Sequence, residues 1–151
     1  MVAFWFRCDL RLKDNHALYR ALSENSEVLP VFIFDQAILN SLPKQDRRVD
    51  FIHRRLSELD EYLRSKGFGG LLVKYGEVRD CWCELMDRYG IKKIYCNRDY
   101  EPKAIDRDHA VEELLRAQGG QLLSFKDQVI FEDSDILKAD GKPYTVYTPY
   151  K

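Results

Sequence analysis

Short apolar runs alternate with longer amphipathic stretches along the 151-residue chain. The apolar runs are rich in β-branched and aromatic side chains and are short enough for strands buried on both faces of a sheet. They predict five strands: Val2–Phe6, Val28–Phe34, Leu71–Tyr75, Lys93–Cys96 and Leu122–Phe125. The amphipathic stretches predict four helices: Asn15–Ser23, Arg47–Lys66, Val78–Tyr89 and Ala104–Gln118. This alternation indicates an α/β fold in three layers, in which crossover helices cover both faces of a five-stranded parallel sheet.

The longest predicted helix, Arg47–Lys66, shows the clearest pattern. Its apolar side chains recur at steps of about three or four residues, which predicts one stripe that packs against the sheet. The stripe consists of Phe51, Ile52, Leu56, Leu59 and Leu63, whereas Arg54, Arg55, Glu58 and Glu61 are expected to face outward. Glycines follow this helix and the next two, at the positions where C-caps are expected.

Composition narrows the possible classes of protein. The 24 basic and 25 acidic residues leave a formal net charge of -1, which gives no support for DNA binding by this chain alone. The four cysteines, at positions 8, 81, 83 and 96, suit neither a disulfide framework nor a structural zinc site. No apolar run approaches the roughly 20 residues of a membrane span. We therefore expect a cytoplasmic, unexported protein.

The alternation of strands and helices ends near Phe125. Beyond it, an acidic turn leads into an extended, proline-bounded stretch from Lys142 to Tyr150. We interpret residues 1–126 as one α/β domain and residues 127–151 as the start of an interdomain linker. A linker at this position predicts that the chain is the first part of a longer protein.

Polar residues follow several of the predicted strands, and in an open parallel sheet ligands bind beyond the carboxyl ends of the strands. These candidates are Arg7, Asp9, Arg11, Asp14 and Asn15 after the first strand, Asp35 and Gln36 after the second, and Asn97, Arg98, Asp99 and Glu101 after the fourth. The first group also has a structural interpretation. Asp14 or Asn15 can cap the helix that follows, and Arg7 and Asp9 can pair with other charges to fix the loop.

The segment Asn97–Pro102 has two interpretations as well. Its carboxylates can accept hydrogen bonds from the N–H groups of a heteroaromatic ring, and arginine can stack on such a ring or bind an acidic tail. Proline and acidic side chains are equally typical of the first turn of a helix, and Asp106, Arg107 and Asp108 continue the charged stretch. The chemistry of these residues leaves both interpretations open.

Several common kinds of site have no signal in the sequence. Neither a Gly-x-Gly-x-x-Gly nor a Gly-Lys-Ser/Thr motif follows the first strand, which argues against the usual phosphate-binding loops. His16, His53 and His109 lie on separate predicted helices without metal-ligand spacing. Trp5 and Trp82 are expected in the core, with a part in electron or energy transfer as the alternative.

The opening segment carries a family signature. Phe4-Trp5-Phe6-Arg7-Cys8-Asp9-Leu10-Arg11-Leu12-Lys13-Asp14-Asn15 resembles the pattern Trp-Phe-Arg-x-Asp-Leu-Arg-x-x-Asp-Asn of photolyases and cryptochromes. Residues 46–52, 97–102 and 144–150 support the resemblance in the same order, so that it covers essentially the whole chain. It implies the Rossmann-like N-terminal α/β domain that precedes a large helical domain in this family.

The resemblance also implies a function. In the family, the N-terminal domain carries an accessory light-harvesting pigment, and the helical domain binds FAD and the damaged DNA. Family photolyases split cyclobutane pyrimidine dimers by light-driven electron transfer from reduced FAD, to which the pigment passes excitation energy. The chain is therefore expected to belong to a deoxyribodipyrimidine photolyase, to be inactive alone, and to meet DNA only through the full-length protein.

The resemblance places the pigment over the carboxyl ends of the strands, in contact with Phe34, Arg48, Asp99 and Glu101. These positions match a deazaflavin-binding pattern better than a folate-binding one, because Lys103 and Ala104 stand where the folate type has an Asn-Glu pair. 8-Hydroxy-5-deazaflavin or a flavin is therefore favoured over methenyltetrahydrofolate. A site without pigment is the alternative, since some relatives carry no detectable antenna.

The sequence is compatible to different degrees with three functions other than that of a photolyase. A cryptochrome-type photosensor uses the same domain for signalling, and the sequence does not separate the two. A free-standing nucleotide-binding module needs a glycine-rich phosphate loop, and a response-regulator receiver needs acidic residues where Arg7 and Tyr75-Gly76 stand. Without its second domain, the chain is expected to expose apolar surface and to self-associate.

Overall fold

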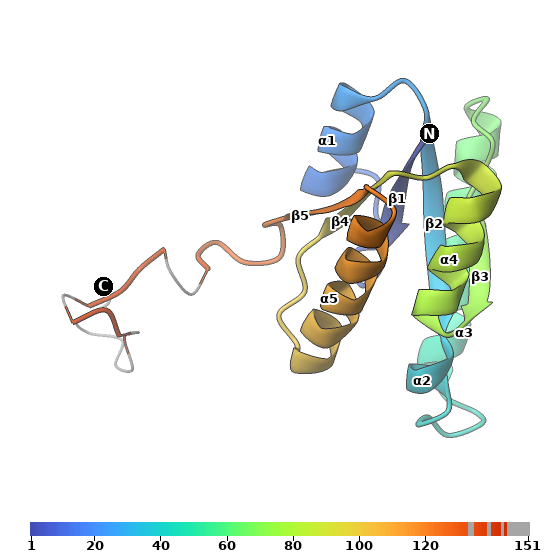
Figure 1. The fold of residues 1–151 in the computed structure, drawn as a ribbon. Helices are drawn as coiled ribbons and strands as arrows, with labels where there is room; N and C mark the ends of the chain where they lie inside the picture. Colours follow the sequence, from blue (N-terminus) through green and yellow to red (C-terminus); the bar gives the residue numbers. More distant parts are fainter. Residues whose placement is uncertain (133–134, 139, 143, 145–151) are drawn as a thin grey trace.

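The computed structural model describes residues 1–132, 135–138, 140–142 and 144 (Figure 1). Five strands form one parallel sheet in the order β3-β2-β1-β4-β5. They are β1 (Val2–Phe6), β2 (Val28–Asp35), β3 (Leu72–Gly76), β4 (Lys93–Asn97) and β5 (Gln121–Phe125). All five predicted strands are confirmed, with shifts of a single residue at most at their ends. The stretch expected to be extended, Lys142–Tyr150, lies mostly outside the described residues.

Five helices connect the strands. They are α1 (His16–Glu24), α2 (Gln36–Leu39), α3 (Arg47–Ser65), α4 (Val78–Tyr89) and α5 (Pro102–Ala117). The sequence pattern predicted all of them except α2, a single turn that is too short to show a helical period. The side chain of Asp35 caps this turn by accepting a hydrogen bond from the backbone N–H of Ala37 at 2.9 Å.

The helices cover both faces of the sheet, which confirms the three-layer architecture (Figure 1). On the side of α4 and α5, the core contains Trp5 and Trp82, whose rings meet edge to face with centroids 5.5 Å apart. On the side of α1 and α3, it contains Phe4, Phe6 and Tyr95. Successive side chains of β1 alternate between the two cores, because side chains of a strand point to opposite faces in turn. Both tryptophans therefore have the core position expected of them.

The structure corrects one expected member of the apolar stripe of α3. Phe51 is 70% exposed, whereas Leu56 and Leu59 are buried. Phe51 precedes Leu56 by five residues, which turns its side chain about 140° away around the helix axis. The remaining members of the stripe, Ile52 and Leu63, pack at the border of the core.

The edge strand β3 departs from the expectation that all strands are buried on both faces. Val73 and Tyr75 are 43% and 61% exposed. They lie beside Phe32 and Phe34 in the register of β2 and β3, on the face that α1 and α3 cover. Nothing in the described part of the chain extends this cover over the edge, so an apolar strip of β3 remains open to solvent.

Two glycines stand where the chain passes from a helix to the next strand. Gly90 follows α4 with a φ of 63°, the left-handed conformation of a helix C-cap. Gly120 precedes β5 in a tight approach, since an added Cβ would lie 2.6 Å from the backbone oxygen of Lys92. Among the helices that the structure describes, none is long and apolar enough to cross a membrane.

Replacement of Gly120 by alanine is predicted to lower the free energy of unfolding by about 1–3 kcal/mol, because the added methyl group collides with rigid backbone. Gly69→Ala is the matched control, since an added Cβ there meets nothing within 4 Å. It should change the free energy of unfolding by no more than about 0.5 kcal/mol. Urea denaturation followed by circular dichroism measures both. Equal stability of the two variants would contradict the close approach at Gly120.

Candidate functional site

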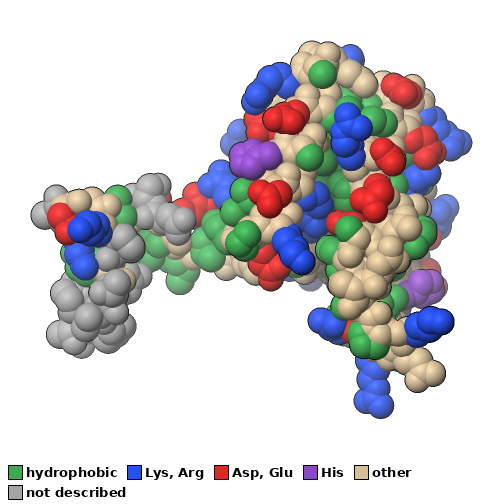
Figure 2. All heavy atoms as spheres, turned by 60° about the horizontal axis from the view of Figure 1, so that its bottom comes forward, with side chains coloured by type: hydrophobic (Ala, Val, Ile, Leu, Met, Phe, Trp, Pro, Cys, Tyr) green, Lys and Arg blue, Asp and Glu red, His purple; other side chains and the backbone are tan. Residues whose placement is uncertain are grey.

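The strand order places a natural opening at the carboxyl end of β1. Because β2 and β4 flank β1 and the connections to them run over opposite faces, the loops that follow these strands separate there. A hollow of about 80 Å³ lies at this point. We call it the rim hollow, and it is lined by Arg7, Cys8, Asp9, Arg11, Asn97, Arg98, Asp99, Asp127 and Gln128. Figure 2 turns the lower end of the view in Figure 1 toward the reader, and acidic and basic side chains are interspersed over this surface.

The floor of the rim hollow is fixed by a buried group of hydrogen bonds. Asn15 and Asn97 are both buried, with 5% and 7% of the residue surface exposed. The Nδ2 atom of Asn97 donates to Asp9 at 2.5 Å and to the Oδ1 atom of Asn15 at 2.8 Å. Its Oδ1 atom accepts from the backbone N–H of Ala17 at 2.9 Å, and Asn15 caps α1 by accepting from Leu18. These bonds join the end of β4, the loop after β1 and the start of α1.

Arg7 supports the same loop from the other face of the sheet. Its guanidinium binds both carboxylate oxygens of Asp108, at 2.5 and 2.7 Å, donates to the backbone oxygen of Asn97, and lies 5.1 Å from the ring of Trp5. Burial opposes the charge of Arg7, but the neighbouring Cys96 and Asp108 more than offset this and raise the pKa of the guanidinium. Arg7 is therefore a permanent charge that is already committed to an ion pair.

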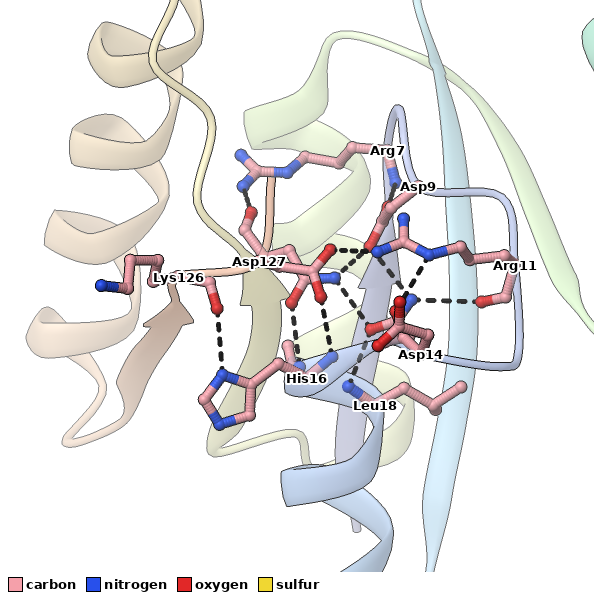
Figure 3. A network of polar contacts seen from close by, with 11 residues as sticks. Arg7, Asp9, Arg11, Asp14, His16, Leu18, Lys126 and Asp127 are labelled. Atoms are coloured by element: carbon pink, nitrogen blue, oxygen red, sulfur yellow. Dashed lines mark hydrogen bonds and ion pairs between the residues drawn. The ribbon is translucent and has the colours of Figure 1, made fainter. Parts of the chain in front are cut away.

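Asp127 ties the chain after β5 to the start of α1 (Figure 3). Its side chain accepts a hydrogen bond from the backbone N–H of His16 at 3.0 Å and pairs with Arg11. The His16 ring nitrogen Nδ1 lies 3.0 Å from the backbone oxygen of Lys126. The structural interpretation of the polar residues after β1 is thus confirmed, since these side chains hold the loop and cap the helix.

Of the four residues expected to contact a pigment, Asp99 is the one that lines the rim hollow. Its Oδ1 atom accepts a hydrogen bond from the backbone N–H of Glu101 at 3.2 Å. Among the residues that the structure describes, its Oδ2 atom has long contacts alone, 3.9 Å to the Cys8 sulfur and 4.0 Å to Arg107. The side chain is 17% exposed. A half-buried carboxylate oxygen without a close donor can accept a hydrogen bond from a ligand.

The other three predicted contacts do not line this hollow. Glu101 is exposed at the N-cap position of α5, where its side chain makes no capping hydrogen bond. Phe34 lies at the end of β2, half-buried and edge-on to Phe32, with ring centroids 5.0 Å apart. Arg48 lies in the first turn of α3 with its side chain 71% exposed, 2.6 Å from the Oδ2 atom of Asp46. Its hydrogen bonds lower the pKa of the Asp46 carboxyl to about 2.

Two neighbours of Asp99 show how its surroundings are charged. Cys8 is an exposed residue, but partial loss of hydration of its thiol, followed by the negative charge of Asp99, raises the pKa of that thiol. Arg107 lies 5.1 Å from the ring of Trp5 and 3.8 Å from Asp108. Its Nε and Nη2 atoms are buried without a hydrogen-bond partner among the described residues. The charge of Arg107 is therefore held near Asp99 by stacking rather than by a close ion pair.

A larger hollow of about 420 Å³ adjoins the rim hollow. We call it the α5–β5 groove, and it is lined by Arg98, Asp99, Tyr100, Ile105, Asp108, His109, Glu112, Leu122, Ser124 and Glu132. Arg98 and Asp99 line both hollows. Asp127 and Glu132 are not among the candidates predicted from the sequence, although Asp127 follows a strand end just as those candidates do.

Comparison with known proteins identifies the class of this chain. The DNA photolyase family model matches residues 2–151, and the chain belongs to this family. It is 32% identical over 149 residues to a deoxyribodipyrimidine photo-lyase of Synechococcus sp., a match that covers 99% of this chain and 31% of that protein. A deoxyribodipyrimidine photo-lyase of Agrobacterium fabrum is 33% identical, with 99% and 30% covered. The chain thus spans about a third of the length of these relatives.

Solved structures agree with this assignment. A class III photolyase from Agrobacterium tumefaciens has a TM-score of 0.84 and 33% identity, and the match covers 99% of this chain and 30% of that one. An archaeal photolyase from Sulfolobus tokodaii has a TM-score of 0.78 and 35% identity, with 91% and 32% covered. Cryptochrome-2 of Arabidopsis thaliana is 30% identical over 97% of this chain and 24% of its own length. The family resemblance of the opening signature is confirmed.

Replacement of Asn97 by alanine is predicted to lower the free energy of unfolding by about 2–4 kcal/mol, because it leaves the buried N–H of Ala17 without its acceptor and removes one of the donors to the Asp9 carboxylate. Asn40→Ala is the control, since Asn40 is exposed and, among the described residues, its side chain makes no hydrogen bond. Urea denaturation measures both variants. An Asn97 variant as stable as the control would show that the buried group of bonds does not hold the loops.

Proposed function

We propose that this chain is the N-terminal, antenna-pigment-binding domain of a deoxyribodipyrimidine photolyase. The observation that carries the proposal is the position of Asp99 at the point where the strand order reverses, with no donor of the described part of the chain closer than 3.9 Å to its Oδ2 atom. When bound, the pigment absorbs light and passes excitation energy onward. Asp99 accepts a hydrogen bond from a ring N–H of the pigment and so fixes its orientation.

The catalytic part of the proposed function belongs to the rest of the parent protein. The relatives named deoxyribodipyrimidine photo-lyase are about three times as long as this chain, and the match covers 30–31% of them. We infer that the parent binds FAD and damaged DNA in that further part, and that it repairs cyclobutane pyrimidine dimers with light. We propose that the chain is inactive by itself, because it spans only 30–31% of these relatives.

The pigment proposed for this site is 8-hydroxy-5-deazaflavin or a flavin. The Sulfolobus tokodaii photolyase is described with two FAD molecules and a novel light-harvesting cofactor, which supports a flavin as antenna in a relative. Asp99 fits such a ring as a hydrogen-bond acceptor, and Glu101 follows it on the same loop. The rim hollow does not fit it in size, because about 80 Å³ is well below the roughly 300 Å³ at which small-molecule pockets begin. Phe34 and Arg48 remain proposed contacts from the β2 side.

A cryptochrome-type photosensor is the second proposal. The 30% identity to Cryptochrome-2 of Arabidopsis thaliana, nearly the same as that to the photo-lyases, supports it. Repair of a thymine-dimer oligonucleotide under blue light by the full-length parent separates the two proposals, since a photosensor without repair activity leaves the dimer intact.

Titration of the chain with 8-hydroxy-5-deazaflavin, FMN and methenyltetrahydrofolate, followed by near-ultraviolet and visible absorption, tests the proposal. Saturable binding of the deazaflavin or of FMN is expected. Asp99→Ala should weaken it about tenfold or more, because the acceptor for the ring N–H is lost. Arg48→Ala tests the contact proposed from the resemblance.

Two variants serve as matched controls for this titration. Arg64→Ala removes an exposed arginine of α3 that is paired with Asp60, as Arg48 is with Asp46. Asp106→Ala removes an exposed carboxylate of α5. Both should bind pigment as the wild type does. Preference for the folate would correct the identity of the pigment, and absence of binding to all three compounds would refute an antenna role for the chain alone.

The exposed edge of β3 predicts self-association at high protein concentration. Val73 and Tyr75 form an apolar strip beside unpaired backbone groups, which is a surface that other chains can cover. Tyr75→Lys should shift the chain toward the monomer in light scattering, whereas Tyr19→Lys on α1, 68% exposed, should not. A wild type that is monomeric at every concentration would rule this prediction out.

A further inference from the structure

The carboxyl ends of β2 and β3 carry two aromatic side chains next to each other. Phe34 and Tyr75 are partners in the register of the two strands, so their side chains point to the same face, the one that α1 and α3 cover. Phe34 is half-buried, and Tyr75 is 61% exposed. Because adjacent strands are about 4.8 Å apart, both rings can lie under one planar ligand. We call this pair the aromatic shelf.

The course of α3 explains why the aromatic shelf is open to solvent. In the second half of the helix, Asp60 accepts a hydrogen bond from the backbone N–H of Leu71, at the start of β3, at 2.7 Å. Closer to the beginning of the helix, the Nε atom of Arg55 donates to the backbone oxygen of Leu10, in the loop after β1, at 2.9 Å. The helix therefore crosses the sheet obliquely, and Tyr75 at the carboxyl end of β3 stays exposed. Ligands of parallel sheets bind at this end of the strands.

The first turn of α3 supplies a positive charge beside the aromatic shelf. Ile52 packs against the same core as Phe34, and Arg48 precedes Ile52 by four residues. Arg48 therefore lies on the same side of the helix, one turn nearer to its start. Its guanidinium pairs with Asp46 at the N-cap and is 71% exposed. An ion pair this accessible to water contributes little to stability, so Arg48 can exchange Asp46 for an anionic group of a ligand.

The aromatic shelf offers a planar ring what the two hollows do not. The rim hollow, about 80 Å³, admits the edge of such a ring but not the whole of it. The α5–β5 groove is large enough, but ionisable side chains form most of its lining. It also lies on the opposite face of the sheet from Phe34, because its Leu122 packs against the core under α4 and α5. A planar ring is stabilised by stacking on aromatic side chains.

We propose that the pigment lies with its ring on the aromatic shelf, and that Tyr75 is a pigment contact in addition to the four expected from the family resemblance. The inference rests on the proposed function, because the occupant is the same planar heteroaromatic pigment. Asp99 follows β4, which is two strand spacings, about 10 Å, from β2, and three fused rings can span this distance. The small rim hollow then receives only the edge that carries the ring N–H.

Arg48 has a partner in either of the two favoured pigments. FMN carries a phosphate, and the hydroxyl group of 8-hydroxy-5-deazaflavin is acidic. A guanidinium pairs with such anionic oxygens and can also stack on the ring. The aromatic shelf and Arg48 thus bind the ring face and an anionic group, whereas Asp99 binds the ring N–H.

Tyr75→Ala tests the aromatic shelf in titrations of the chain with FMN and with 8-hydroxy-5-deazaflavin, followed by absorption. The protein is kept dilute, so that contacts between chains at β3 do not compete. Loss of one stacking partner should raise the dissociation constant about fivefold. Tyr75→Phe, which keeps the ring, should restore most of the lost affinity. Because Tyr75 is exposed, both variants should keep the circular dichroism of the wild type.

The double variant Asp99→Ala/Tyr75→Ala shows whether both residues contact the same bound pigment. Asp99 and Tyr75 follow or end strands that are not neighbours in the sheet, so their effects should be independent. A tenfold loss at Asp99 and a fivefold loss at Tyr75 then combine to about fiftyfold. A double variant that binds as well as Asp99→Ala alone would overturn the aromatic shelf.

Two variants are matched controls for these titrations. Tyr19→Ala removes a tyrosine of α1 that is 68% exposed, a fraction similar to that of Tyr75. Ile105→Ala removes a 40% exposed apolar side chain that lines the α5–β5 groove. Both should bind FMN as the wild type does. Weaker binding by Ile105→Ala, together with wild-type binding by Tyr75→Ala, would place the pigment in the groove instead.

The remaining outcomes separate the aromatic shelf from the proposed function. Unchanged affinity of Tyr75→Ala for both pigments would overturn the shelf and leave the proposed function standing. If this variant also lost the self-association of the wild type in light scattering, the surface around Tyr75 would be a contact between two copies of the chain. Failure of the wild type to bind either pigment would refute the proposed function and the shelf together.

Discussion

The side chain of Asn97 joins three parts of the molecule that are distant in sequence, and the geometry of the candidate site depends on it. It lies at the end of β4 and bonds to the loop after β1 and to the start of α1. A buried amide has both donors and an acceptor to satisfy, and here each has a partner. Because a buried polar group without partners is costly, this arrangement selects one relative position of the two loops. The residues at the bottom of the opening between β1 and β4 are therefore held in fixed relative positions.

Most charges around that opening are already committed to one another. Arg7 binds Asp108, Arg11 binds Asp127, and Arg98 binds Glu132. Asp99 is the exception, since it keeps one oxygen away from close donors. A ligand thus meets a rim whose net charge is nearly balanced and which offers one strong acceptor, which suits a neutral ring with N–H groups better than a phosphate.

The fold could be predicted from sequence because its elements are long enough to show a period. The strands and the four longer helices follow from apolar runs and amphipathic repeats, whereas α2, a single turn capped by Asp35, carries no period to detect. The prediction that Phe51 lies in the core was wrong. A repeat of about three or four residues also admits a side chain beside the apolar stripe, and at this position of the helix that side chain points to solvent.

The site was less accessible to sequence reasoning than the fold. The rule that ligands bind at the carboxyl ends of strands found Asp99. It could not distinguish a carboxylate that is able to accept a ligand from carboxylates that are already engaged in ion pairs. That distinction depends on partners such as Arg107 and Asp108, which α5 brings back to the sheet. Arg48 and Phe34 come from the family resemblance, and their contacts with a pigment remain predictions.

The pair of Trp5 and Trp82 has a consequence for optical studies of this molecule. These are the only two tryptophans of the chain, and both lie in the core on the side of α4 and α5. Intrinsic indole fluorescence therefore reports on one half of the molecule, whereas loosening of α1 and α3 is seen only through tyrosine. Because Arg7 and Arg107 each lie 5.1 Å from the ring of Trp5, the same emission also senses charge beneath the rim. Tryptophan fluorescence thus monitors one face of the sheet and not the other.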